Sequence, residues 1–326
     1  MLLSDDNIYS YSANLETVRN RKDKSVLVVN SDSPNPLELL ADDVAFPVEV
    51  KYLHLNADVG YRHELIENYT KDDFYFKSIL KFVNVKTLDL DSVDLDVSIW
   101  KELCATFTKL ETLKLCNSHD YSNIEDTPEI LELICSIPNL KHLELIGFKE
   151  LETFPKFNNS RIEILYISQL WSSNESLQNI KQFSNLKKLI LINCHYFEKN
   201  LQVLSGFSTL EHLSINLKIA QKKSRIQANK YLTLILDSSP NLKTLWIESF
   251  YQKFISDEKK FNHIEHLRLW FEVFENWSVE EIYKQFPNLK IFETCDTISS
   301  SEIVSYSLSG KNIKHNSKYK LKRYDQ

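Results

Sequence analysis

The stretch from Leu186 to Cys194 reads LKKLILINC and places apolar residues at its first, fourth and sixth positions and a cysteine at its ninth. An amphipathic helix would sustain apolar spacings of three and four over several turns, and a half-buried strand would alternate from its first residue. The stretch follows neither pattern, so its meaning depends on whether it recurs elsewhere in the chain.

The six-residue pattern at the start of this stretch recurs along most of the chain. The copies begin 22 to 35 residues apart. They are VKYLHL from Val50, VKTLDL from Val85, LETLKL from Leu110, LKHLEL from Leu140, IEILYI from Ile162, LKKLIL from Leu186, LEHLSI from Leu210, LKTLWI from Leu242, IEHLRL from Ile264 and a degenerate LKIFET from Leu289. Self-similarity at such a period is typical of a solenoid, in which each unit stacks on the next.

Apolar segments with helical spacing and recognisable ends lie between the copies. In the segment DTPEILELICSIPNL, Thr127 is suited to cap a helix, Pro128 suits its first turn and Pro138 stops it. Ser278 and Glu281 are spaced as a capping box before a second such segment. We therefore predict that each unit consists of one strand, one loop and one helix.

The pattern LxxLxL, with asparagine or cysteine at the ninth position, resembles the leucine-rich repeat family over residues 48–298. The similarity is greatest to its cysteine-containing, F-box-associated and ribonuclease-inhibitor types. This resemblance implies an α/β solenoid, or horseshoe, of about ten irregular repeats with a concave parallel β-sheet and convex helices. One departure is that Val93, Phe148, Leu170 and Phe250 occupy the ninth position in other units, so a regular asparagine or cysteine ladder is absent.

The two ends of the chain do not carry the repeat. Residues 1–47 are expected to form an N-terminal capping segment, in which Ser25 to Val29 adds an edge strand next to the leucine-rich repeat domain at 48–298. Residues 299–326 are expected to form a C-terminal cap and a basic tail. We interpret this tail and the basic run at 221–230 as solvated helix faces or disordered ends, with nuclear import or phosphate contact as the alternative.

Composition and charge argue against several classes of protein. The formal net charge of the 326 residues is -6, which argues against binding nucleic acid through bulk charge. No apolar run is long enough for a signal-peptide core or a membrane span, so we expect a cytoplasmic protein, with the nucleus as the alternative location. The five cysteines are widely spaced without a CxxC pair, which favours reduced thiols over disulfides or a zinc site.

No motif of a catalytic or cofactor site is recognisable in the sequence. His142, His212 and His266 share the third position of their copies, but the closest two lie two strands, about 10 Å, apart. That separation is too large for a single metal ion. We therefore expect no enzymatic activity, no cofactor, no metal site and no small-molecule substrate.

The positions that do not face the core are the ones available for binding. Lysine and glutamate alternate at the second position from Lys86 onward, which predicts a ladder of ion pairs between neighbouring strands. The third, fifth and seventh positions are polar and partly acidic in the N-terminal copies, at His54, Asp89, Asp91 and Glu144. In later copies they are apolar or aromatic, and Arg268 stands beside Trp246, which predicts a cation–π pair.

Aromatic residues and arginine are the side chains most enriched in binding hot spots. We therefore predict a partner-binding surface made of Ile164, Tyr166, Ile190, Ile192, Trp246, Arg268 and Trp270. The alternative is that loops cover these side chains. The predicted function is a non-enzymatic protein–protein interaction scaffold that binds a protein partner on its concave face. A substrate-recognition subunit of an F-box-type ubiquitin ligase is the alternative, although it follows from fold resemblance alone and no F-box is recognisable.

Overall fold

The structure is a computed structural model. It describes residues 10–11, 26–29, 50–56, 79–91, 95, 97–116, 127–148, 154, 161–169, 177–192, 194, 203–216, 222–250, 259–271, 279–295, 302–309 and 312–320. The chain divides into two compact units, Met1–Tyr166 and Ile167–Gln326.

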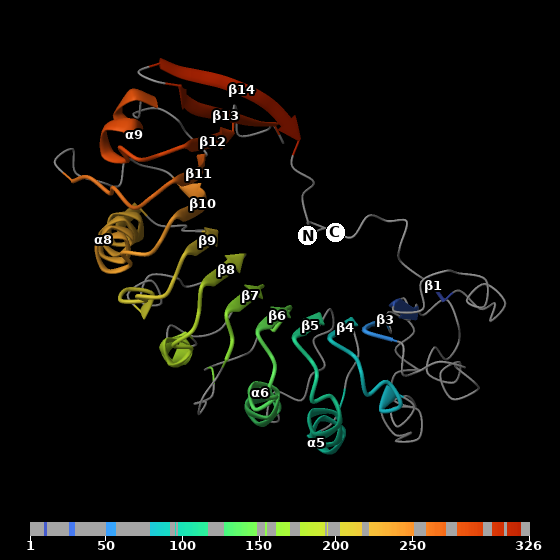
Figure 1. Ribbon diagram of the computed structural model, residues 1–326. Helices are drawn as coiled ribbons and strands as arrows, with labels where there is room; N and C mark the ends of the chain where they lie inside the picture. Colours follow the sequence, from blue (N-terminus) through green and yellow to red (C-terminus); the bar gives the residue numbers. More distant parts are fainter. Residues whose placement is uncertain are drawn as a thin grey trace. The chain divides into compact units, whose positions relative to one another are not determined.

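The first unit contains parallel strands that follow one another in sequence order (Figure 1). They are β1 Ser10–Tyr11, β2 Val26–Val29, β3 Tyr52–Asn56, β4 Thr87–Asp91, β5 Thr112–Cys116 and β6 His142–Ile146, and β7 Ile164–Ser168 begins in this unit. The helices described in this unit are α5 Val97–Thr106 and α6 Thr127–Cys135.

The second unit repeats the arrangement and ends differently. Its parallel strands are β8 Lys188–Ile192, β9 His212–Asn216, β10 Thr244–Phe250, β11 His266–Phe271 and β12 Ile291–Cys295. They are followed by the antiparallel pair β13 Glu302–Ser309 and β14 Asn312–Lys320. The helical segments are η2 Gln178–Gln182, a 3₁₀ helix, with α8 Lys222–Ser238 and α9 Val279–Gln285.

Each of the ten sequence copies contains one strand, and each strand begins at the third position of its copy. Neighbouring strands are in register, so Leu189, Leu213 and Leu245 are Cα partners at the fourth position. The first, fourth and sixth residues are buried throughout the described copies, as in Leu186, Leu189 and Leu191. The third and fifth positions of the strands alternate with them on the other face. The predicted α/β class with a parallel sheet and a buried apolar stripe is confirmed.

A buried phenylalanine three residues before the first position extends the repeat. Phe82, Phe107, Phe183, Phe207, Phe261 and Phe286 occupy this place and are 0 to 5 % exposed. In five of these six copies the backbone N–H of the first residue donates to the carbonyl of the phenylalanine, as from Leu110 to Phe107 (3.0 Å), and this bond closes the turn that leads into the strand. Complete burial of such a side chain contributes about 2 to 3 kcal/mol. The sequence analysis missed this position.

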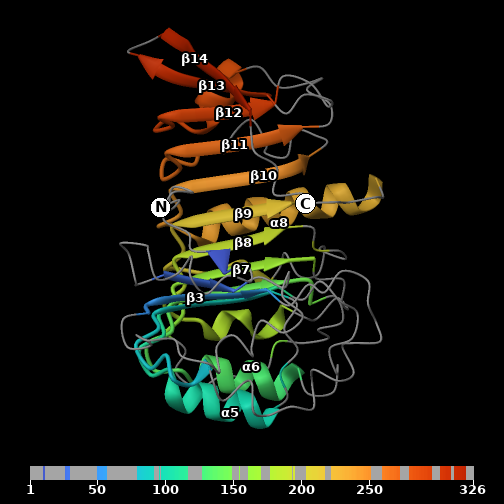
Figure 2. The same cartoon turned by 90° about the vertical axis from the view of Figure 1, so that its right-hand side faces the viewer.

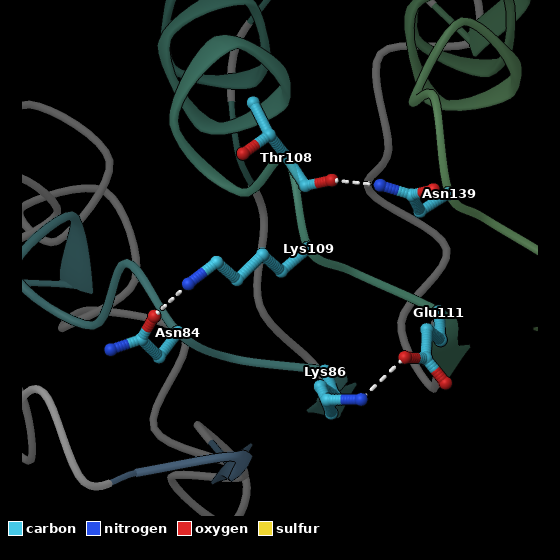
Figure 3. Close-up of polar contacts among 6 residues, drawn as sticks. All are labelled: Asn84, Lys86, Thr108, Lys109, Glu111 and Asn139. Carbon is cyan, nitrogen blue, oxygen red and sulfur yellow. Dashed lines mark hydrogen bonds and ion pairs between the residues drawn. The ribbon is translucent and has the colours of Figure 1, made fainter.

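A second contact recurs at five turns and joins each of them to the turn of the preceding copy. The residue just before the first apolar position donates from its side chain to the carbonyl that stands two residues before that position in the previous copy. The bonds join Asn139 to Thr108 (2.7 Å), Arg161 to Pro138 (3.0 Å), Thr209 to Ser184 (3.2 Å), Asn241 to Ser208 (2.6 Å) and Asn288 to Asn262 (2.6 Å). Figure 3 shows the first of them. We call these contacts the turn ladder.

The ninth position, where the sequence analysis found no regular ladder, is described in the structure at Cys194. Cys194 is 2 % exposed, and its Sγ lies 3.5 Å from the carbonyl oxygen of Ile192 and 3.9 Å from that of Ile167. It is therefore a buried residue at the end of its strand, as predicted. Val93 and Leu170 lie outside the described residues.

The predicted helices and the predicted edge strand can be compared with the structure. Helix α6 begins at Thr127 and ends before Pro138, and α8 contains most of the basic run at 221–230. Strand β2 forms within the segment predicted as an edge strand, although β1 pairs beyond it. The basic tail was predicted as a helix face or a disordered end, whereas Asn312–Lys320 forms strand β14. Ser278 lies outside the described residues, and no helix among those described is long and apolar enough to cross a membrane.

Candidate functional site

The strand face that carries the third and fifth positions is the face on which a site can form. Figure 2 looks onto the strands of the second unit, and α8 lies behind them. In that unit the fifth positions of β8 to β12 form a lateral row through the strand register: Ile190, Ser214, Trp246, Arg268 and Glu293. We call this set the fifth-position row.

Trp246 lies at the centre of a cluster of nitrogen-bearing side chains. The guanidinium carbon of Arg268 lies 4.0 Å from the centroid of the indole ring, which confirms the predicted cation–π pair. The rings of His212 and His266 meet the indole edge-on, with centroids 4.7 Å and 5.8 Å away. These two histidines face Thr244 from β9 and β11, so they flank the strand that carries Trp246. We call Trp246, Arg268, His212, His266 and Glu293 the tryptophan cluster.

Glu293 fixes the position of Arg268. Its Oε2 accepts a hydrogen bond from Nε of Arg268 (2.8 Å) and forms an ion pair with Nη2 of the same residue (2.7 Å). It also lies 2.9 Å from Nε2 of His266. The side chains of Arg268 and Glu293 are only 14 % and 8 % exposed. The sequence analysis did not single out Glu293, because it stands in the most degenerate copy. The signal was available, since the alignment of copies places Glu293 beside Arg268.

Two nitrogen atoms in the cluster have no hydrogen-bond partner among the described residues. They are Nε1 of Trp246 and Nε2 of His212, and both are buried from solvent. Burial, followed by the nearby charges of Lys188, His266 and Arg268, lowers the pKa of His212 to about 3. His212 is therefore neutral at physiological pH, and the positive charge of the cluster comes from its neighbours.

The predicted partner-binding residues do not all lie together. Trp246 and Arg268 are in direct contact, and Ile190 lies in the same row with Ser214 between it and Trp246. Ile192 lies on the same strand as Ile190, and both side chains are partly exposed. Trp270 lies on β11, on the same strand as Arg268.

Ile164 and Tyr166 belong to β7 and to the first unit. Both are partly exposed, and the residues between and beside them, Leu165 and Ile167, are buried. Ile291 was not predicted as a site residue. It is 37 % exposed, it stands at the third position of its copy, which is the first residue of β12, and it is the Cα partner of His266 on β11.

The first unit presents a polar face instead. The hydroxyl of Tyr52 donates to Oδ2 of Asp89 (3.1 Å), and Nδ1 of His54 lies 3.2 Å from the same oxygen without hydrogen-bond geometry. On β5 and β6, Nζ of Lys114 and Nε2 of His142 lie 3.3 Å and 2.9 Å from the carboxylate of Glu144. Burial alone would raise the pKa of Glu144, but the hydrogen bonds and charges of His142 and Lys114 hold it below its usual value.

The second-position residues lie just outside the strands and not on their face. Lys86 and Glu111 form an ion pair of 2.6 Å (Figure 3), and Lys290 pairs with Glu265. These pairs confirm the predicted alternation at two steps. Their side chains are largely exposed, so these pairs add little to the stability of the fold.

The described residues offer no group of three or more histidine, cysteine or acidic side chains placed to hold a metal ion. Burial raises the pKa of the Cys104 thiol to about 12, and burial with the neighbouring Asp91 does the same for Cys116. Neither thiol is therefore an activated nucleophile.

Comparison with known proteins identifies no relative: no model of a protein family matches the chain, and no curated protein matches it.

Proposed function

We propose that the chain is a non-enzymatic scaffold of the leucine-rich repeat type, a horseshoe-like solenoid that binds a protein partner on the concave face of its sheet. The sites of contact are the fifth-position row of the second unit and the apolar residues beside it. The observation that carries the proposal is that Trp246 is held between Arg268 and two histidines on a strand face that also presents isoleucines.

Rigid placement is what makes this cluster suited to binding. Arg268 is held by a hydrogen bond and an ion pair to one buried carboxylate oxygen, so its position over the indole ring is set before any partner arrives. A side chain that is already immobilised loses little conformational entropy on association. Tryptophan and arginine in such settings account for much of the affinity of protein interfaces.

Isoleucines extend the surface on either side of the cluster. Ile190 and Ile192 lie on β8, and Ile291 lies on β12. Exposed or partly exposed apolar side chains therefore stand on the first and the last of the unit's parallel strands, with Trp246 on a strand between them. Isolated exposed apolar residues need no explanation, but several on one sheet face favour an interaction site. A protein surface with apolar side chains complements them.

The test is affinity capture from the source cell followed by mass spectrometry. Wild type is compared with a variant carrying Trp246→Ala, Arg268→Ala and Trp270→Ala, and with the control Leu234→Ala on α8, where Leu234 is 42 % exposed. We expect a partner that wild type and the control capture and the triple variant loses, with unchanged circular dichroism. Capture of the same proteins by all three would refute the proposed site. A cullin-linker subunit retained through residues 1–47 would instead favour the ubiquitin-ligase alternative.

A further inference from the structure

The outer edge of β14 is an end of the sheet that the structure describes. In the strand order β14 has β13 on one side, and no described strand stands on its other side (Figure 1). In an antiparallel ladder every second residue of a strand directs its backbone N–H and C=O away from the partner strand. The strand runs from Asn312 to Lys320 without a proline, so each of its residues has a backbone donor and a backbone acceptor. This edge is therefore a template on which a further strand can pair.

β14 carries more positive charge than any other strand that the structure describes. It contains Lys314, Lys318 and Lys320 and no acidic residue. In the sequence, residues 311–323 include six lysine or arginine residues and no aspartate or glutamate. The neighbouring strand β13 contributes a single acidic residue, Glu302, which is the Cα partner of Lys320. The pair β13–β14 therefore keeps an excess of positive charge when both of its strands are counted.

The register of β14 determines which of its lysines a neighbouring strand would meet together. One extra residue, Asn316, interrupts the pairing with β13, and Ser317–Lys320 forms a regular run beyond it. Within this run Lys318 and Lys320 are two residues apart, so the backbone places them on the same face of the strand. A strand added alongside presents every second residue to that face. Two acidic residues separated by one other residue therefore match this run.

The same lysines disfavour a second copy of the chain as the added strand. If the β14 strands of two copies paired with each other, three lysines from each would come together without an acidic residue. Like charges on directly opposite strands are destabilising, and lysines and bulges at sheet edges are devices by which proteins prevent edge-to-edge association. An acidic strand meets no such repulsion, so the charge of the edge discriminates in its favour.

Beyond the proposed function, we propose that β14 is a second interface, which takes up an extended acidic segment of a partner protein as an added strand. Backbone hydrogen bonds along the outer edge of β14 hold the segment. Two of its carboxylates, separated by one residue, pair with Lys318 and Lys320. This interface is separate from the tryptophan cluster, because β13 lies between β14 and the strand that carries Glu293.

A nucleic acid fits this edge less well than an acidic strand. Binding to a phosphate backbone draws its affinity from cationic contacts alone. A polypeptide strand uses the same charges and also satisfies the backbone N–H and C=O groups along the edge. The net charge of the whole chain, -6, further disfavours a long polyanion.

The first experiment measures the binding of a fluorescein-labelled seven-residue peptide of alternating Val and Asp to the full chain by fluorescence anisotropy. We expect it to bind at least about tenfold more tightly than the same peptide with Asn in place of Asp. The double substitution Lys318→Gln and Lys320→Gln should weaken binding about tenfold. The control, Lys260→Gln with Lys284→Gln, removes two exposed charges elsewhere in the same unit and should change binding by less than about twofold. Circular dichroism should be the same for all chains.

A second experiment tests the added strand without changing the chain. Methyl groups are placed on the backbone nitrogens of either the Val or the Asp residues of the peptide. Because successive residues of a strand direct their N–H groups to opposite edges, each set blocks one edge of the peptide and leaves its charge unchanged. Only one edge can pair with β14, so one methylated peptide should lose about tenfold or more in affinity and the other should bind as the parent does.

Several outcomes would overturn the inference. They are no binding of the Asp peptide, equal binding of the Asp and Asn peptides, equal effects of the two double substitutions, or the same effect of methylation at both sets of nitrogens. Tighter binding of a single-stranded oligonucleotide would also refute it, as would a dimer of the chain that the peptide dissociates, since a second copy would then occupy the edge. The triple variant of Trp246, Arg268 and Trp270 should bind the peptide as wild type does, so this proposal and the proposed function fail separately.

Discussion

Glu293 lies beside Arg268 on the next strand and holds it against Trp246, with one carboxylate oxygen 2.8 Å from Nε and 2.7 Å from Nη2 of the arginine. Three neighbouring strands thus contribute one residue each to a single arrangement, because Trp246, Arg268 and Glu293 occupy the same position of β10, β11 and β12. The relation depends on strand register, since a shift of one residue would move each side chain to the opposite face.

Replacing Glu293 by Gln tests this arrangement. The variant keeps the shape of the side chain but leaves the guanidinium of Arg268, which is 14 % exposed, without its counter-charge. We expect a loss of about 2 to 3 kcal/mol in the free energy of unfolding, measured by urea denaturation followed by circular dichroism. Lys86→Gln, which breaks an exposed ion pair, is the control and should cost less than about 1 kcal/mol. Equal effects of the two substitutions would contradict the importance of burial.

The turn ladder predicts small and additive losses of stability. Asn139→Ala, Asn241→Ala and Asn288→Ala each remove one hydrogen bond to the carbonyl of the preceding turn. Each should cost about 0.5 to 1 kcal/mol, and the triple variant should cost about the sum, because the sites share no partners. Ser208→Ala is the control, since Ser208 accepts from Asn241 through its backbone carbonyl, which the substitution keeps. A control that is destabilised as much as the others would show that the side chain acts in some other way.

The ion cluster around Glu144 predicts a dependence of stability on acid pH. The pKa of Glu144 is lowered in the folded chain, so the unfolded state binds more protons as the pH falls below the ordinary value near 4.5. The stabilisation is therefore complete above that value and is lost as the pH falls through the folded pKa. We expect Glu144→Gln to be less stable than wild type at about pH 6 and nearly equal to it at about pH 3. Urea denaturation at both values measures the difference, and an unchanged gap at pH 3 would contradict it.

The described thiols should be inert in the folded chain. Cys104 and Cys116 have pKa values raised to about 12, burial raises the pKa of Cys135 as well, and Cys194 is 2 % exposed. In a Cys295→Ser background, 5,5′-dithiobis-(2-nitrobenzoic acid) at pH 8 should label none of them within minutes but all of them in urea. The labelling rate of the folded chain should rise with pH, because the thiolate is the reactive form. One rapidly labelled thiol at pH 8 would be inconsistent with the burial of that residue.

The sequence was sufficient to predict the strands and the buried face, because the apolar spacing repeats ten times and each copy confirms the others. It predicted the contact between Trp246 and Arg268, since equal positions in neighbouring copies are lateral neighbours. It did not predict Glu293, whose copy carries Thr294 in place of the usual apolar residue at the sixth position. The pairing β13–β14 was also missed, because the segment at 302–320 carries no copy of the repeat and its basic residues suggested an irregular end.

The turn ladder was missed for a different physical reason. The Pro-Asn-Leu sequences at Pro138 and Pro240 lie in the turns. The acceptor of each asparagine is a backbone carbonyl in the preceding copy. Every residue type has such a carbonyl, so the side-chain pattern of the sequence does not identify the acceptor. Arg161 and Thr209 make the same contact with other side chains, so the identity of the donor is not fixed even where its role is. Similarly, the partnerless nitrogens of Trp246 and His212 follow only from three-dimensional packing.

The turn ladder anchors only the entrance of each strand, at the residue before its first apolar position, while successive copies begin anywhere from 22 to 35 residues apart. Insertions and deletions in the stretch between one strand and the next turn therefore leave the alignment of the strands untouched. Under mutational drift the two surfaces of such a chain can therefore diversify separately. The helical side can gain or lose residues, whereas the strand side can exchange single side chains while the register of the strands stays the same.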